Sequence, residues 1–173
     1  MAAFIATPLE PPTVGLIAEL VEGGWRVLVP APGPGRDRIA WTDYLGLVRP
    51  NANLERAAIP PDEALIPPDG LDSFGGLDPP GPPDSLGLLG PEALAACRLV
   101  LAPALAVDRT GTRLGQGGGW YDRALAFAAP GALILAVCFD WEVWPADALP
   151  REPHDRPVDG VLSSQGVELF NRA

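Results

Sequence analysis

Residues 99–139 read LVLAPALAVDRTGTRLGQGGGWYDRALAFAAPGALILAVCF, and this stretch decides the class of fold. It begins with a nearly continuous apolar run over 99–107, typical of a strand that is buried on both faces. A polar, glycine-rich loop over 108–119 follows, then a segment of helical character over 120–127, and then a second apolar run over 132–139. This order predicts an α/β fold with neighbouring parallel strands.

The N-terminal segment repeats the same order of elements. Residues 2–6 are apolar and predict a strand. Residues 25–29, which Pro30 follows, predict another. Thr13 is placed as a helix N-cap, because apolar residues follow it at helical spacing: Val14, Ile17, Ala18 and Val21. Residues 158–162 predict a last short strand before a polar tail.

The composition changes over about 50–91, where Pro-Pro pairs and glycines replace periodic apolar residues. This stretch has too few apolar residues in periodic order to build a core of its own, so we interpret it as a surface connection. A short helix opened by Pro91 should follow it. We therefore expect a single domain over 1–173, which is long enough to bury a core.

Composition excludes several classes of function. The formal net charge is −10 and all 12 cationic side chains are arginine, which argues against a nucleic-acid partner. No apolar run approaches the roughly 18 residues that span a bilayer, and no basic region precedes the N-terminal apolar residues. Cys97 and Cys138 lack CxxC spacing, so both should be reduced and buried. We expect a cytoplasmic monomer or weak oligomer that acts on small molecules.

The glycine-rich loop is the best candidate for a site. Ligands of open α/β sheets bind beyond the carboxyl ends of strands, where glycines let backbone N–H groups approach phosphate oxygens. Arg113 and Arg123 flank the loop and could donate to phosphate or carboxylate. Without lysine a Walker A loop is excluded, and the spacing is not GxGxxG. The alternative interpretation is a plain glycine-rich turn.

These residues carry a resemblance to a known family. Residues 99–123 resemble the signature of the 5-formyltetrahydrofolate cyclo-ligase family, whose loop reads approximately RLGxGxGYYDR. Residues 152–160, EPHDRPVDG, are similar to the family's EPHDxPVD segment, which precedes its final strand. A weaker match is the opening strand followed by Glu10 and Thr13. Together the matches cover most of the chain outside the Pro-rich stretch, in the family's order.

The resemblance implies a three-layer α/β/α fold with a mostly parallel sheet. It also implies cyclisation of 5-formyltetrahydrofolate to 5,10-methenyltetrahydrofolate, driven by ATP and Mg²⁺, with release of ADP and phosphate. In that family ATP phosphorylates the formyl oxygen, a neighbouring folate nitrogen attacks the activated carbon, and phosphate departs. Such an enzyme positions its substrates and neutralises charge. No catalytic residue is assigned.

Site residues follow from the resemblance by position. The residues implied to bind ATP are Arg113, Leu114, Gly115, Gln116, Gly117, Gly118, Gly119, Trp120 and Tyr121. Those implied to bind the folate substrate are Ile5, Glu10, Gln116, Gly117, Gly118, Gly119 and Trp120. The implied Mg²⁺ ligands are Asp122 and Asp155, since Mg²⁺ commonly takes one or two carboxylates plus phosphate oxygens and water.

Each assignment has an alternative that involves no ligand. Asp122 could be an ordinary acid in the first turn of a helix, and Asp155 an acid that closes a turn. Glu10 could be a solvated turn residue, and Ile5 could be a core residue of a strand. His154, the only histidine, belongs to a turn in the family, so we do not assign it acid–base chemistry.

The sequence departs from the family in two ways. Family members usually begin with a helix bearing a Lys/Arg-rich patch that contributes to ATP binding, whereas this sequence starts almost at the first strand, and we expect that patch to be absent. Arg36, Arg38 or Arg56 could replace it. Trp120-Tyr121 stands for the tyrosine pair. Two other functions stay open: a non-catalytic folate- or nucleotide-binding relative, and an unrelated small α/β enzyme acting on a sugar phosphate or acyl-CoA.

Overall fold

The computed structural model describes residues 1–31, 38–44, 88–152 and 155–170. Backbone contacts separate a unit formed by Met1–Tyr44 and Gly87–Ala173 from a unit formed by Leu45–Leu86, and the described residues belong to the first. The connection expected at about 50–91 therefore lies, up to residue 87, outside the described residues, as do Arg36, Arg56 and His154. The expectation of a single domain stays a prediction.

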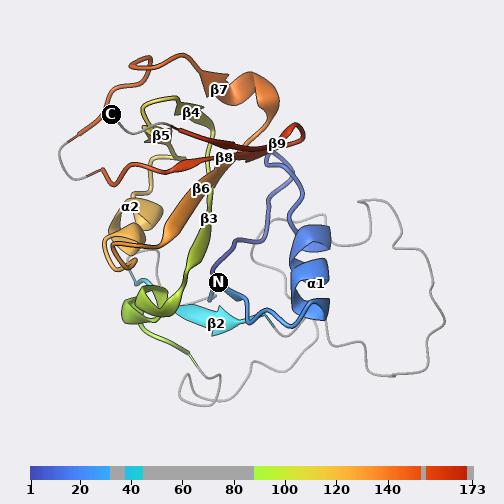
Figure 1. The fold of residues 1–173 in the computed structure, drawn as a ribbon. Helices are drawn as coiled ribbons and strands as arrows, with labels where there is room; N and C mark the ends of the chain where they lie inside the picture. The colour runs from blue at the N-terminus through green and yellow to red at the C-terminus, as the bar shows by residue number, and fades with distance from the viewer. Residues whose placement is uncertain (32–37, 45–87, 153–154, 171–173) are drawn as a thin grey trace. The chain divides into compact units, whose positions relative to one another are not determined.

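The main sheet is built around two parallel strands, β3 (Leu99–Pro103) and β6 (Leu133–Val137). β8 (Gly160–Ser163) pairs parallel with β6, and β9 (Gly166–Leu169) pairs antiparallel with β8 at the sheet's edge (Figure 1). The polar tail expected after residue 162 is therefore partly strand β9. The alternation of buried and exposed residues gave no signal for it, because all four residues of β9 are exposed.

The N-terminal residues continue the sheet beyond β3. Ala2 forms parallel bridges to Val100 and to Leu28, although residues 2–6 form no strand of their own, contrary to the prediction. β1 (Leu28–Pro30) then pairs antiparallel with β2 (Trp41–Asp43). The parallel bridge between Ala2 and Leu28 agrees with the strand–helix–strand order predicted for this segment.

A second, smaller sheet contains the strand that leads into the glycine-rich loop. It has the order β5 (Arg113–Leu114), β4 (Ala106–Asp108), β7 (Val143–Trp144). The expectation of one strand over 99–107 is wrong, because the backbone changes partner between β3 and β4. The N–H of Ala104 donates to Val137, in β6, whereas the N–H of Leu105 donates to Leu114, in β5.

The helices begin close to where the sequence predicts. α1 (Val14–Glu22) has Thr13 at its N-cap, but the Thr13 hydroxyl makes no capping bond. It instead donates to the carbonyl of Phe4 (2.6 Å) and accepts from the N–H of Ala6 (3.0 Å), which ties the N-terminal segment to the start of the helix. A 3-10 helix spans Pro91–Ala96, and α2 (Trp120–Leu125) follows the glycine-rich loop.

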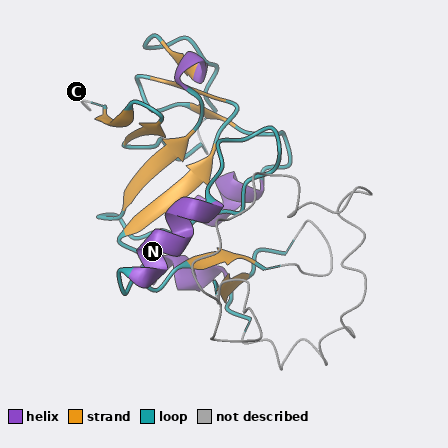
Figure 2. Cartoon of the chain, turned by 90° about the vertical axis from the view of Figure 1, so that its right-hand side faces the viewer, coloured by secondary structure: helices purple, strands orange, loops and turns teal. Residues whose placement is uncertain are grey.

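Neighbouring residues of the parallel strands belong to two separate core clusters. Val100 and Ile134 pack in the cluster that includes Leu125 of α2, whereas Leu101 and Leu135 pack in the cluster that includes Ile17 of α1. Figure 2 shows helices beside the strands of the main sheet. Since successive side chains of a strand point to opposite faces, both faces of the parallel pair are covered. The α/β class is confirmed with mixed strand pairing, while the three-layer arrangement stays a prediction.

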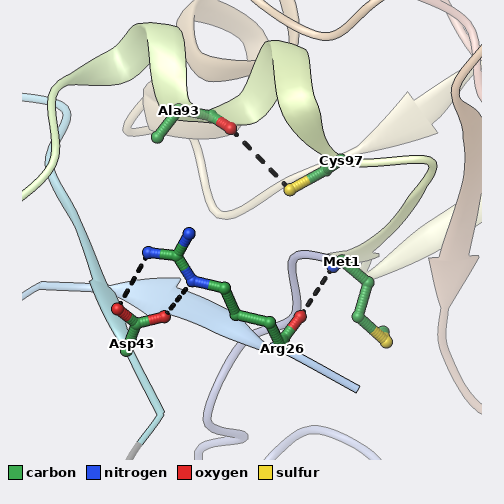
Figure 3. A network of polar contacts seen from close by, with 5 residues as sticks. All are labelled: Met1, Arg26, Asp43, Ala93 and Cys97. Atoms are coloured by element: carbon green, nitrogen blue, oxygen red, sulfur yellow. Dashed lines mark hydrogen bonds and ion pairs between the residues drawn. The ribbon is translucent and has the colours of Figure 1, made fainter. Parts of the chain in front are cut away.

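Polar contacts join the N-terminus, Arg26 and the last residue of β2 (Figure 3). The Arg26 guanidinium makes a bidentate pair with Asp43 (2.6 and 3.0 Å), and the N-terminal amine donates to the Arg26 carbonyl (2.8 Å). Cys97 and Cys138 are buried and unpaired, as predicted. Burial raises the pKa of both thiols, that of Cys138 to about 12, so both remain protonated at neutral pH.

No helix within the described part of the chain is long and apolar enough to cross a membrane. The cytoplasmic location and the monomeric or weakly oligomeric state stay predictions.

Candidate functional site

The glycine-rich loop connects β5 to α2, and its backbone conformation requires glycine at two positions. Gly117 has φ +84°, and Gly119, the N-cap of α2, has φ +61°, in the left-handed region that other residues rarely adopt. A Cβ at Gly117 or Gly118 would meet no atom within 4 Å. The loop backbone is therefore open to a ligand at these residues.

Arg113 and Asp122 join the two ends of the loop. The Arg113 side chain is only 4% exposed, and its Nη2 pairs with Oδ1 of Asp122, in the first turn of α2. Its Nη1 donates to the carbonyl of Pro103 (3.1 Å), the last residue of β3. The guanidinium thus neutralises Asp122 and fixes the loop to the main sheet. Direct bidentate contact with a phosphate would have to replace one of these partners.

Arg123 lies on the exposed side of the same loop. Its Nη1 donates to the carbonyl of Gly118 (3.3 Å), and a Cβ at Gly119 would lie 3.0 Å from that nitrogen. Arg123 is exposed, in contrast to the buried Arg113. The more accessible of the two flanking cations is therefore the one that follows the loop.

Three aromatic rings contact one another where the loop leads into α2. Trp120 makes edge contacts with Trp41 (centroids 5.1 Å apart) and with Tyr121 (4.8 Å). Its indole N–H donates to the carbonyl of Arg38 (3.3 Å). A tyrosine at this position would offer a hydroxyl instead of a ring N–H. This cluster brings the residues before β2 beside the loop, so Arg38 is the candidate replacement cation that the structure places near it.

The Tyr121 hydroxyl is buried and finds no hydrogen-bond partner among the described residues. Burial is the main cause that raises its pKa, and nearby Glu10 raises it further, while Arg113 lowers it. The guanidinium of Arg113 lies 5.9 Å from the Tyr121 ring centroid. Tyr121 therefore presents a neutral phenol, able to donate to a ligand that reaches it.

Glu10 lies beside the loop, although 106 residues separate it from Gln116. Its Oε2 accepts from the N–H (2.7 Å) and the hydroxyl (2.9 Å) of Thr7, and its Oε1 accepts from Nε2 of Gln116 (3.3 Å). Glu10 is 8% exposed, so the alternative of a solvated turn residue is wrong. Its carboxylate is instead held in a fixed orientation at the loop.

Ile5 is not a core residue. It lies outside any strand and is 54% exposed, whereas the preceding Ala3 and Phe4 are buried. The core alternative for Ile5 is therefore wrong, and its side chain is available for contact with a ligand. Leu114, 47% exposed, is similarly accessible at the start of the loop.

Asp155 closes a turn, as its alternative interpretation proposed. Its Oδ2 accepts from the N–H of Glu152 (2.8 Å), and its own N–H donates to the Glu152 carbonyl (3.0 Å). The turn role leaves the Mg²⁺ role untested, because a carboxylate has lone pairs for both. Within the described ranges, no group of three or more His, Cys, Asp or Glu could hold a metal ion.

The two aspartates fit Mg²⁺ only in the mode that relies on phosphate and water. Asp122 gives Oδ1 to Arg113, yet its side chain is 30% exposed, so the carboxylate is not fully enclosed. Mg²⁺ usually keeps several waters and binds one or two carboxylates together with substrate phosphates. The donor set is compatible with this mode and too small for an all-protein cage.

Sequence reasoning assigned no role to Asp108, the most fully buried carboxylate of the site. Its Oδ1 accepts from the N–H and hydroxyl of Thr110 and the N–H of Thr112, and its Oδ2 accepts from the N–H of Leu149. Burial alone would raise its pKa, but these hydrogen bonds together lower it. An acid at the end of a buried strand, followed by Thr and Gly, could have indicated this Asx turn.

Two hollows among the described residues lie away from the loop. One of about 320 Å³ is bordered by β8, β9 and Asp140, and one of about 340 Å³ lies near Pro130 and Phe170. We give more weight to the loop, because charged, aromatic and glycine residues converge there, whereas both hollows are shallow.

Comparisons with known proteins identify the family to which the chain belongs. Residues 1–164 match the model of the 5-formyltetrahydrofolate cyclo-ligase family. The chain is 35% identical to a 5-formyltetrahydrofolate cyclo-ligase of Mycolicibacterium smegmatis, over 94% of this chain and 72% of that protein. It is 31% identical to a mitochondrial 5-formyltetrahydrofolate cyclo-ligase of Arabidopsis thaliana, over 51% of this chain and 36% of that protein.

Two solved structures share the fold at lower sequence identity. The 5,10-methenyltetrahydrofolate synthetase of Aquifex aeolicus has a TM-score of 0.60 and 23% identity, covering 99% of this chain and 72% of that one. The synthetase of Mycoplasma pneumoniae has a TM-score of 0.54 and 14% identity, covering 92% and 71%. With the match over residues 1–164 and the 35% identity, the conclusion is direct: the chain belongs to the 5-formyltetrahydrofolate cyclo-ligase family of enzymes.

Proposed function

We propose that this chain converts 5-formyltetrahydrofolate to 5,10-methenyltetrahydrofolate, consuming ATP in the presence of Mg²⁺ and releasing ADP and phosphate. The observation that carries the proposal is the Glu10–Gln116 contact, because it places an anchored carboxylate at the glycine-rich loop. One side of the loop thereby offers backbone donors for phosphate, and the other offers an acceptor for a ring N–H. A reaction between a nucleotide and a folate needs both.

The phosphate side is formed by the loop from Gly115 to Gly119. Its open backbone allows the close approach that phosphate oxygens require. Arg123 adds exposed positive charge next to Gly118, and Arg113 adds buried positive charge beneath the loop. In a chain of net charge −10, such local cations are needed to hold a triphosphate.

The folate side is formed by Glu10, Gln116, Ile5 and the aromatic cluster. Among the described residues, Oε1 of Glu10 receives one long bond, from Gln116 (3.3 Å), so it can accept from an N–H of a pterin ring in addition. The exposed Ile5 side chain offers apolar contact next to it. Trp120 and the buried Tyr121 hydroxyl lie behind the loop and limit how deeply a ligand enters.

Asp122 and Asp155 would hold Mg²⁺ together with phosphate oxygens and water. When bound, the ion would supply positive charge that neutralises the transferring phosphate. Arg113 has a complementary task in the protein, because its pairing with Asp122 fixes the direction of that carboxylate.

The chain's own residues position the reactants, and no protein nucleophile is required. Phosphate is transferred from ATP to the formyl oxygen, the neighbouring folate nitrogen forms a bond to the formyl carbon, and the carbon–oxygen bond breaks as phosphate leaves. Holding the formyl oxygen in line with the terminal phosphate converts the first step into a reaction of pre-positioned groups. Glu10 would fix the ring, and the loop would fix the triphosphate.

The proposal is tested with the purified chain, Mg-ATP and 5-formyltetrahydrofolate. We expect the near-ultraviolet absorbance of the methenyl product to rise, in proportion to the ADP released. Folate binding without any ATP-dependent rise in absorbance would replace the proposal with the non-catalytic folate- or nucleotide-binding alternative. ATP turnover that does not depend on folate would contradict the proposed reaction, while the alternative of an enzyme unrelated to this family is already overturned by the family match.

Replacing Glu10 with Gln should weaken folate binding while sparing ATP. The amide keeps the shape of the side chain but removes the charge that strengthens a hydrogen bond from a ring N–H, which corresponds to a rise in folate KM of roughly tenfold or more. Glu19→Gln, an equivalent change on an exposed residue of α1, is the matched control. Equal folate KM values for the two variants would remove Glu10 from the substrate site.

A further inference from the structure

Arg156 makes a set of hydrogen bonds whose function the family resemblance does not assign. Its Nη1 donates to the carbonyls of Leu125 (2.9 Å) and Ala128 (2.5 Å), and its Nη2 donates to the carbonyl of Ala129 (2.9 Å). These acceptors are the last residue of α2 and two residues just beyond it. Arg156 occupies the variable position of EPHDxPVD, so the motif itself does not call for arginine there.

The contact matters for α2 because that helix is short. It spans six residues, far below the length at which a helix is stable by itself, so its order depends on tertiary contacts. The final carbonyls of a helix lack partners within the helix, and a cation is favourable at that end. Arg156 supplies both the donors and the charge, while Ala124 and Leu125 provide the buried apolar face.

Both proposed metal ligands are linked to the contact between Arg156 and the end of α2. Asp155 precedes Arg156 in the chain, and its carboxylate closes the turn with Glu152. Asp122 lies in the first turn of α2, the helix whose other end Arg156 binds. The same side chain therefore fixes the backbone next to one carboxylate and the helix that carries the other.

We propose that Arg156 is a positioning residue for the metal site, which holds the Asp155 turn in register with Asp122 by binding the carbonyl of Leu125, the last residue of α2, and those of Ala128 and Ala129 just beyond it. The inference rests on the proposed function, since it assumes that both aspartates hold Mg²⁺. Arg156 itself touches neither substrate nor metal in this arrangement. It acts through the two backbone segments that it joins.

A purely structural role for Arg156 predicts a different result for its removal. Its removal would then lower the thermal unfolding midpoint and leave the Mg²⁺ dependence of the remaining activity unchanged. A positioning role predicts that the Mg²⁺ concentration for half-maximal activity rises even at temperatures far below the thermal unfolding midpoint. Partners that orient metal ligands typically contribute about tenfold or more to metal affinity or activity, so a shift of about tenfold is expected.

The test compares Arg156→Met, Arg156→Lys and a control, Arg109→Met. Arg109 makes a bidentate pair with Glu168 on β9, so the control removes the same guanidinium and the same charge from a residue whose ion pair is with β9 rather than with α2. Mg²⁺ titrations of activity are run at saturating ATP and folate, with thermal midpoints measured for each protein. Amide hydrogen exchange over residues 120–129 reports the order of α2 directly.

We expect Arg156→Met to raise the Mg²⁺ requirement about tenfold and to speed exchange in α2, with Arg156→Lys in between because lysine can serve fewer carbonyls at once. Arg109→Met should match the parent in both measurements. A Mg²⁺ requirement for Arg156→Met equal to that of the control would overturn the inference. If Arg156→Met does not fold, the Lys variant decides in the same way.

Failure of the proposed function gives a distinct result. A parent chain with no Mg²⁺-dependent, ATP-driven formation of the methenyl product would contradict the proposed function itself. A parent that is active and Mg²⁺-dependent, together with unchanged Arg156 variants, contradicts only the positioning role.

Discussion

Asp122→Asn is expected to lower kcat/KM for ATP by roughly 100-fold and to raise the Mg²⁺ requirement, the largest effect that the site predicts. The change removes an anionic oxygen ligand and also leaves Arg113, only 4% exposed, with a neutral partner. The amide oxygen can still accept from Arg113, and Asp122 is partly solvated, so the free energy of unfolding should fall by only ~1–2 kcal/mol. Mg²⁺ titrations of activity, beside denaturant unfolding, measure the two effects separately.

Asp43→Asn is the matched control for this variant. Asp43 also pairs with an arginine, Arg26, here through two hydrogen bonds, but both side chains are well exposed, at 38% and 69%. An exposed pair contributes little, so activity, Mg²⁺ dependence and unfolding should all resemble the parent. If Asp122→Asn titrates with Mg²⁺ as Asp43→Asn does, Asp122 does not bind the metal.

Gly117→Ala should impair ATP binding by about tenfold to 100-fold, out of proportion to its effect on folding. The residue has φ +84°, so alanine imposes backbone strain of ~1–2 kcal/mol, and its methyl group would stand where the loop is open to a ligand. Gly119→Ala, at φ +61°, should behave in the same way, with the added contact to Arg123. ATP affinity and thermal midpoint are measured on the same preparations.

The chain offers a close control in Gly166, the first residue of β9, directly after the turn from β8. This glycine has φ +106°, and a Cβ there would also meet no atom within 4 Å, so Gly166→Ala carries a similar strain at a distance from the loop. We expect the two variants to lose similar stability and only Gly117→Ala to lose ATP affinity. Equal ATP affinities would show that the loop is only a turn.

The sequence predicted those parts of the fold that local patterns encode. The helix after Thr13 and the parallel strands β3 and β6 follow from periodicity and apolar runs, and they lie where the patterns indicate. The small sheet was not predictable in this way. Strands such as β5 and β7 have two residues each, too few to show a period of two.

The candidate site shows the same limit for contacts between distant residues. The loop was identified from its own composition, whereas the approach of Glu10 to Gln116 was available only through resemblance to a family. Arg156 gave no signal at all, because its partners are backbone carbonyls 27 to 31 positions away, and a carbonyl is present at every residue. Asp108 was similarly overlooked, since its donors are mainly backbone N–H groups.

The parallel bridges of Ala2 have a consequence for the order in which the molecule is made. On the ribosome, the first residues emerge long before Val100, so one of the two backbone partners of Ala2 does not yet exist. Contacts between residues so far apart in sequence also close slowly, because chain entropy must be lost before they form. Since Glu10 follows the same segment and meets Gln116 only across that closure, the candidate site cannot form before Gln116 has left the ribosome.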